Sequence, residues 1–205
     1  DVIDLEEFIK NNKFKRHKNI IFFIKAIFIK TLLGKSAEEI TNFLKEKDDA
    51  ATFEWNFENN FEPKSEQVAN YVLTEITLHL GSTYSDVRPV GKLTVEHILP
   101  KNPEKSEWTA FFDNYDGNAQ KKLGKFTYKI GNQTLLTQPI NSAVSNKGFD
   151  KKKNYKKNGQ PKGYNSSELE INTKTVMAYD EWTATIVEER CQTFAQYAKE
   201  IWSLD

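Results

Sequence analysis

A carboxylate and an imidazole stand side by side at the end of a short apolar segment, in the sequence KLTVEHILPKN at residues 92–102. Neighbouring side chains of a β-strand point to opposite faces, so Glu96 and His97 could face one small ligand only where the strand breaks into a turn. A histidine whose pKa lies near neutrality can take a proton from water, and a carboxylate suits a hard divalent ion. The pair is therefore either incidental or the start of a catalytic site.

Two asparagines follow in an informative order. Asn132 lies at the turn into a second short apolar segment, QTLLT, and Asn141 lies nine residues later at the start of a predicted helix. The order of strand, strand and helix, with a histidine ending the first strand, is the layout of a ββα-metal site. There the histidine activates a water, while a carboxylate and an amide oxygen hold one Mg²⁺ or Mn²⁺ ion. Asn146 is the second choice for the amide ligand.

Each of these residues also has an ordinary structural interpretation. A histidine before Ile-Leu-Pro can be packed and hydrogen-bonded in a core. Asn132 after Gly131 is typical of a turn, and Asn141 can be a helix N-cap. The occurrence of all three in this order favours the catalytic interpretation.

The zero net charge of the 205-residue chain hides a segregation of charge. Residues 91–165 carry 14 Lys and Arg against 6 Asp and Glu, and both flanks are acidic. A basic middle segment indicates contact with a polyanion, and a solvated lysine-rich loop explains it equally well. We expect double-stranded DNA as the partner, with phosphates contacted by lysines from this segment: Lys147, Lys151, Lys152 and Lys153.

Hydrophobic periodicity predicts an α+β chain that is mostly α. Apolar residues recur every four positions between Ser65 and Gly81, which predicts one long helix. Short strands are expected at 92–98 and 133–137, and a helix in two pieces, broken near Gly148, is expected after them. The segments 117–132 and 151–165 are expected to be loops.

The two ends of the chain are also expected to be helical. The segment 19–34 is apolar but interrupted by lysines and too short to span a bilayer cleanly, so it is expected to be a buried helix. A long last helix is expected from an N-cap at Asp180, and Arg190 on it is expected to form a structural ion pair. We expect a helical support region at 1–88 and a catalytic domain at 89–205.

The cysteine content and the first residues of the chain indicate the expected cellular location. Cys191 is the one cysteine, which excludes a disulfide within the chain and a multi-cysteine zinc site. No secretory signal pattern is found at the start, and no membrane association is expected, so a cytoplasmic location fits. Because the first residue is Asp1 rather than Met, we expect the chain to be part of a longer protein.

The segments VEHILP and GNQTLLT, with the asparagines and lysines that follow, resemble a known family over residues 92 to about 204. The family is the HNH-type domain at the C-terminus of GmrSD-type modification-dependent restriction enzymes. The resemblance implies a ββα-metal (HNH, or His-Me finger) core with flanking C-terminal helices. It also implies a DNA endonuclease of an anti-phage defence protein, joined to an N-terminal nucleotide-hydrolysing sensor domain.

The resemblance also implies residue roles. His97 matches the general base, and Glu96 the acidic metal ligand beside it. Asn132 matches the middle asparagine, which orients the histidine or shapes the loop, and Asn141 or Asn146 matches the third position. Many such sites have a third-position histidine and a zinc–cysteine cage, and this chain has neither, so no structural zinc is expected. The alternatives are a non-catalytic nucleic-acid-binding module and a protein-interaction module.

Overall fold

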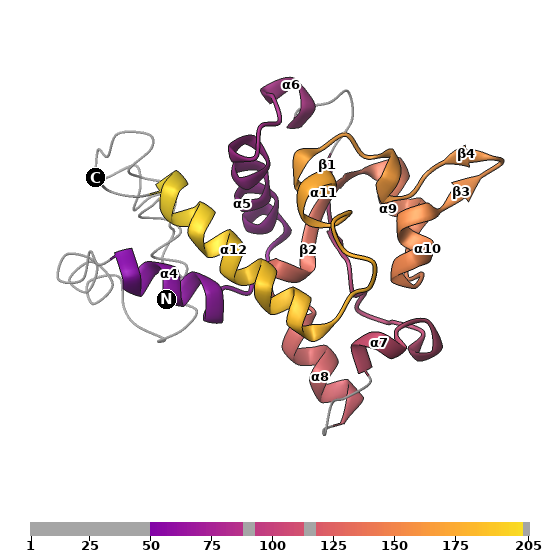
Figure 1. The fold of residues 1–205 in the computed structure, drawn as a ribbon, viewed down its shortest axis with the longest axis horizontal. Helices are drawn as coiled ribbons and strands as arrows, with labels where there is room; N and C mark the ends of the chain where they lie inside the picture. Colours follow the sequence, from indigo (N-terminus) through magenta and orange to yellow (C-terminus); the bar gives the residue numbers. More distant parts are fainter. Residues whose placement is uncertain (1–49, 88–92, 113–117, 203–205) are drawn as a thin grey trace, which may run out of the picture.

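The computed structural model describes residues 50–87, 93–112 and 118–202. Helices make up most of this part of the chain, and its strands form two small antiparallel sheets, so the α+β, mostly α class is confirmed (Figure 1). The helix expected at 19–34 lies outside the described residues. Of the helices that the structure describes, none combines the length and apolar character that crossing a membrane requires.

The elements follow one another in a mixed order of helices, short 3-10 turns and strands. The helices are α4 (Ala50–Asn60), α5 (Glu66–His79), α6 (Tyr84–Val87), α7 (Thr109–Phe112), α8 (Ala119–Phe126), α9 (Gln138–Val144), α10 (Phe149–Asn154), α11 (Glu170–Thr175) and α12 (Ala184–Trp202). The strands are β1 (Leu93–His97), β2 (Gln133–Thr137), β3 (Lys156–Lys157) and β4 (Gln160–Pro161), and the 3-10 turns are η1 (Lys105–Glu107), η2 (Ile130–Asn132) and η3 (Tyr164–Ser166).

The first sheet joins two segments that lie far apart in the sequence. β1 and β2 pair in antiparallel register, with Leu93 opposite Thr137 and His97 opposite Gln133. Helix α9 follows β2 directly and packs against both strands, with a proline in its first turn, where no hydrogen-bond donor is needed. The two expected strands are confirmed, and they are followed by a helix as the sequence order predicts.

Helix α5 confirms the periodicity of the sequence. It begins after Ser65, and the chain leaves it at Gly81, whose φ of +115° suits glycine. Val72 and Ile76 are fully buried, and the helix packs against β1 and β2. Buried residues before and after residue 88 thus belong to one hydrophobic core. The division of the whole chain at residue 88 stays a prediction, since residues 1–49 and 88–92 lie outside the described part.

Helix α12 packs closely on the turn that enters β2. At Gly131 a Cβ atom would lie 2.2 Å from the carbonyl oxygen of Val187 and 2.8 Å from the amide nitrogen of Cys191, so only glycine fits. The Gly131 N–H donates to the Cys191 Sγ at 3.3 Å. This close approach fixes the turn that contains Asn132.

Arg190 of α12 is completely buried on the same turn. Its guanidinium donates to the carbonyl oxygens of Gly131 and Gln133 and lies over the rings of Trp182 and Phe194. The expectation of an ion pair is wrong, because its partners in the described part of the chain are carbonyls, a hydroxyl and aromatic rings. Burial lowers the pKa of Arg190 to about 10, so the group stays charged at neutral pH.

The expected start of the last helix is also wrong. Helix α12 begins at Ala184, and the hydroxyl of Thr183 accepts the N–H of Ile186 at 3.2 Å. Asp180 lies before this start and pairs with Lys153 at 3.5 Å. Residues 180–183 are not helical, and Trp182 among them lies in the core.

Two segments expected to be loops form regular structure. Helix α8 begins at the N-cap Asn118, whose side chain accepts the N–H of Gln120, and buries Leu123 and Phe126. The stretch 151–165 contains the end of α10, the hairpin β3–β4 and the start of η3. Figure 1 shows the hairpin extending from the body beside α10. Their lysine-rich composition predicts solvated loops, because it does not show that Lys122, Lys152 and Lys153 are themselves buried.

Candidate active site

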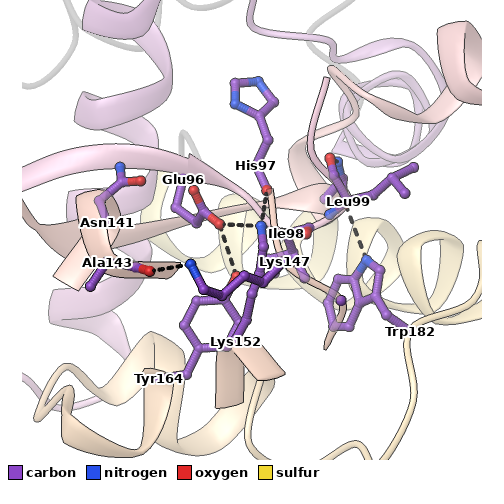
Figure 2. A network of polar contacts seen from close by, with 12 residues as sticks. Glu96, His97, Ile98, Leu99, Asn141, Ala143, Lys147, Lys152, Tyr164 and Trp182 are labelled. Carbon is purple, nitrogen blue, oxygen red and sulfur yellow. Dashed lines mark hydrogen bonds and ion pairs between the residues drawn. The ribbon is translucent and has the colours of Figure 1, made fainter. Parts of the chain in front are cut away.

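The end of β1 presents two neighbouring side chains on its two faces. Glu96 lies opposite Thr134 and His97 opposite Gln133, so the strand remains paired through both residues. Adjacent side chains of a paired strand project to opposite faces. Figure 2 shows the imidazole of His97 pointing away from the carboxylate of Glu96. The two groups therefore have separate environments.

The Glu96 side is closed and hydrogen-bonded. Its Oε1 accepts from Lys152 Nζ at 2.6 Å and from the Tyr164 hydroxyl at 2.9 Å. The same ammonium donates to the carbonyl oxygens of His97 at 3.1 Å and Ile98 at 2.9 Å (Figure 2). Burial raises the pKa of Glu96 and lowers that of Lys152, and the opposite charge of each partner opposes these shifts.

The His97 side is more open and less satisfied. The imidazole is half-buried, meets the edge of the Tyr128 ring at 5.5 Å between centroids, and has no hydrogen-bond partner for Nε2 among the described residues. Burial, helped by the positive charges of Lys101 and Lys152, lowers the pKa of His97 to about 4. A neutral imidazole with a free nitrogen can accept a proton or coordinate a ligand.

Asn132 fixes the turn that follows His97. Its Oδ1 accepts the Leu99 N–H at 2.8 Å and the Trp182 indole N–H at 3.1 Å. Its Nδ2 donates to the carbonyl oxygens of Leu99 at 3.0 Å and Thr127 at 3.1 Å, and its own carbonyl accepts the Ile98 N–H. All of its hydrogen-bonding groups serve the protein, and its exposed fraction is 0%. Such a residue shapes the loop and cannot touch a substrate directly.

Asn141 lies on the same face of β1 as Glu96. Its Nδ2 donates to the Thr94 hydroxyl at 2.8 Å and to the Val95 carbonyl at 3.3 Å. Because Thr94 and Glu96 are two residues apart on the strand, their side chains share that face. No donor within the described residues reaches Asn141 Oδ1. Asn146 is exposed, beyond the end of α9, with no side-chain hydrogen bond in the described part.

Two of the lysines expected to bind DNA lie at or near the surface. Lys147 Nζ donates to the Ala143 carbonyl at 2.9 Å and lies 4.5 Å from the centroid of the Tyr155 ring. Lys151 is exposed and forms an ion pair with Glu107 at 2.5 Å. Both could turn toward a phosphate at small cost, since exposed ion pairs contribute little.

The other two lysines lie inside the protein. Lys152 has an exposed fraction of 0% and is bound to Glu96, as described above. Lys153 is also buried, donates to the Tyr179 carbonyl and pairs with Asp180. In this structure neither ammonium is available to a DNA phosphate. Two of the three lysines of α10 are therefore engaged in contacts within the protein.

Tyr164 and Trp182 belong to the site, although the sequence did not single them out for it. Tyr164 is fully buried, and its hydroxyl supports Glu96, whereas Trp182 was expected only in the core and also donates to Asn132. Burial raises the pKa of Tyr164 well above its ordinary value, so the hydroxyl remains a donor. The one available signal for Tyr164 is an aromatic residue within the polar stretch 156–167.

The oxygen donors on the Glu96 face suit a hard divalent ion in their chemistry. Glu96 Oε2 receives no side-chain hydrogen bond from the described residues, although the backbone N–H of His97 also stabilises this carboxylate. Asn141 Oδ1 receives no hydrogen bond from the described residues. Carboxylate and amide oxygens are ligands that Mg²⁺ and Mn²⁺ accept, with water completing the shell. In the described part of the chain, no group of three or more His, Cys, Asp or Glu side chains could hold a metal.

Comparison with known proteins gives one match. The family model described as GmrSD restriction endonucleases, C-terminal domain, matches residues 45–197, which is well over half of the chain. The matched segment begins before α4 and ends within α12, so it contains every residue discussed above. No curated protein and no solved structure matches the chain.

Proposed function

Because this chain belongs to the family of GmrSD restriction endonuclease C-terminal domains, we propose that it hydrolyses DNA phosphodiester bonds with His97 as general base. The observation that carries this proposal is the buried, unpartnered Nε2 of His97, which lies beside the hydrogen-bonded side chains of Glu96 and Asn132. A buried nitrogen without a partner costs free energy, and a catalytic role is one explanation for such a group. In the described residues, Trp108 Nε1, Gln133 Oε1 and Arg190 Nε are also buried without partners, so the proposal also depends on the position of His97 at the end of β1.

The pKa of His97 is lower than the near-neutral value expected from the sequence, because burial disfavours the charged imidazolium. Since burial lowers its pKa to about 4, the imidazole is neutral at pH 7 and can take a proton from an attacking water. A phosphate near Lys101 would offset the positive charge that depresses this pKa and make the imidazole more basic. The edge contact with Tyr128 limits the rotation of the ring.

We propose that Glu96 and Asn141 hold one Mg²⁺ or Mn²⁺ ion. Asn141 is preferred over Asn146 because it is bound to β1 on the Glu96 face, whereas Asn146 is exposed. The ion would supply positive charge for the phosphate and the leaving oxygen. Glu96 would share its carboxylate between Lys152 and the ion, so Oε2 is the atom available for it.

We propose that Asn132 is a positioning residue, which does not contact the substrate. Its bonds to both backbone groups of Leu99 hold the chain that leaves β1, and this turn sets how His97 is presented. The proposed site thus belongs to the HNH, ββα-metal type, within the domain predicted at 89–205. We propose that the full protein acts in the cytoplasm against phage DNA, with an N-terminal nucleotide-hydrolysing domain that selects the double-stranded target.

The test is conversion of supercoiled plasmid to open-circle and linear forms with Mg²⁺, Mn²⁺ or EDTA. His97→Ala should reduce the rate by about 10²–10⁴-fold, which is the usual contribution of a general base. His79→Ala is the matched control, because His79 lies at the surface beside Glu200, away from β1. A folded His97→Ala variant that cuts at the parental rate would overturn the assignment.

A second candidate function is non-catalytic DNA binding. The observation in its favour is the closed state of Glu96, whose charge Lys152 already compensates. The same plasmid assay separates the two functions, because a binding module gives no metal-dependent product. Retarded migration of uncut plasmid in EDTA and in Mg²⁺ alike would favour this candidate.

A further inference from the structure

The hairpin β3–β4 is a polar arm next to the candidate site. Lys156 pairs with Pro161 and Lys157 with Gln160, and the turn at Asn158 and Gly159 has positive φ at both residues. These φ values are typical of a tight two-residue hairpin turn. All of β3, the turn and β4 are exposed, and Figure 1 shows the arm leading away from the body.

Positive charge on this arm is not compensated by the protein. Residues 151–167 carry 6 lysines and no Asp or Glu. The first three of these lysines, in α10, form ion pairs, as described above. Lys156 and Lys157 are exposed, and neither they nor the half-buried Lys162 form an ion pair within the described residues. The free charge is therefore concentrated on the hairpin.

The base of the arm is rigidly attached to the Glu96 side of the site. The Lys162 N–H donates to the Tyr155 carbonyl at 2.8 Å and closes the hairpin. At Gly163 a Cβ would lie 2.4 Å from the carbonyl oxygen of Lys153, so the two chain segments touch there. Lys152 before the arm and Tyr164 after it both bind the Glu96 carboxylate.

We infer that the β3–β4 hairpin is a DNA-binding arm that contacts phosphates of the duplex beside the scissile bond through Lys156 and Lys157. The complement of an uncompensated cationic arm is a polyanionic backbone. Since lysine contacts to phosphate carry no sequence information, the arm contributes affinity and register rather than target choice. Its place beside the cutting site rests on the proposed function, whereas its binding of DNA can be measured without cleavage.

The experiment measures binding of a short fluorescein-labelled DNA duplex by anisotropy in EDTA, in the His97→Ala background, over a range of KCl concentrations. Lys156→Gln/Lys157→Gln is compared with Lys125→Gln/Lys199→Gln, which removes the same charge from exposed lysines paired with Glu188 and Glu54. The arm variant should raise Kd by about tenfold or more near 0.1 M salt and reduce the slope of log K against log salt by about 2. The control variant should change both much less.

Two outcomes would overturn the inference: an unchanged Kd for the arm variant, or equal losses for the arm and control variants. Failure of the proposed function gives a different result. If the parental chain binds DNA through the arm but never cuts plasmid, the nuclease assignment fails and the arm stands. If it cuts plasmid and binds independently of the arm, only the inference fails. Circular dichroism and thermal unfolding of each variant confirm that the exposed substitutions leave the fold intact.

Discussion

The two sides of the end of β1 differ in how fully their polar groups are satisfied. On the Glu96 side, one carboxylate, one ammonium and one phenol form a buried network, and the ammonium also donates to two carbonyls. On the His97 side, the imidazole Nε2 has no partner in the described residues, and nearby Lys101 is exposed. The two environments belong to adjacent residues of the chain.

This difference distinguishes residues that hold the site in place from the residue that could react. Groups whose hydrogen bonds are all made within the protein can stabilise and orient, and Asn132 and Lys152 are of this kind. A group that keeps an unused nitrogen pays for it in stability and remains able to react. The comparison therefore predicts that variants on the Glu96 side change stability first, and that changes to His97 affect activity first.

The largest stability effect is expected from Lys152→Met. Removing the ammonium leaves the Glu96 carboxylate buried without its counter-charge, which should reduce the free energy of unfolding by about 3–5 kcal/mol. Because burial raises the pKa of Glu96, the folded variant should take up a proton as the pH falls. The loss should then be larger at pH 8 than at pH 5, measured by urea unfolding at both values.

Lys151→Met is the matched control for this experiment. Lys151 is the neighbouring lysine, but it is exposed and paired with Glu107, so its removal should cost at most about 1 kcal/mol. The double variant Glu96→Gln/Lys152→Met should recover part of the stability, because no buried charge remains. Equal losses from Lys151→Met and Lys152→Met would show that the Glu96 side is not the closed network described here.

A smaller effect on the same side is expected from Tyr164→Phe. The change removes one hydroxyl that donates to the Glu96 carboxylate at 2.9 Å and should cost about 1.5–3 kcal/mol. Tyr155→Phe is the control, since no hydroxyl hydrogen bond of Tyr155 is found in the described residues. If Glu96 also holds the ion, Tyr164→Phe should raise the Mg²⁺ concentration needed for half-maximal cutting, and Tyr155→Phe should not. A loss in the Glu96→Gln background as large as in the parental chain would contradict the direct contact.

Periodicity predicted the elements that bury a regular apolar face. The stripe that includes Val72 and Ile76 gave α5, and the apolar run of β2 gave a strand. Two elements within lysine-rich sequence were missed, namely α8 and the exposed hairpin after α10. Composition reports the average polarity of such a segment, whereas α8 depends on the buried Leu123 and Phe126, and the hairpin depends on the turn at Asn158 and Gly159.

The proximity of the candidate residues was predictable from the sequence, whereas their hydrogen-bond partners were less so. Spacing brought Glu96, Asn132 and Asn141 to one end of the sheet, as their order suggested. The burial of Lys152 and Lys153 could not be read from the sequence, because a run of lysines is usually solvated. Tyr164 reaches Glu96 across 68 residues of sequence, and local patterns carry no information on such a contact.

On the His97 side, the comparison predicts a loss of stability in acid. The pKa of His97 is lowered to about 4 in the folded chain, mainly by burial, from its ordinary value of 6.5. Above pH 6.5 the imidazole is neutral in both states, so its contribution to stability is fully present there. Between pH 6.5 and 4 only the unfolded chain takes up the proton, and this contribution is progressively lost.

The variant His97→Asn removes the titrating group and tests this loss. Relative to the variant, the wild type should lose about 1–2 kcal/mol between pH 8 and pH 5, since each pH unit below 6.5 is worth at most about 1.4 kcal/mol and partial exposure reduces it. Urea unfolding at pH 8, 6 and 5 measures the difference, and NMR titration of the imidazole gives the pKa directly. Equal slopes for the two proteins would mean that the folded chain protonates His97 as readily as the unfolded chain does. The imidazole would then be solvated rather than held as a desolvated, neutral base, and the contrast between the two sides of β1 would be lost.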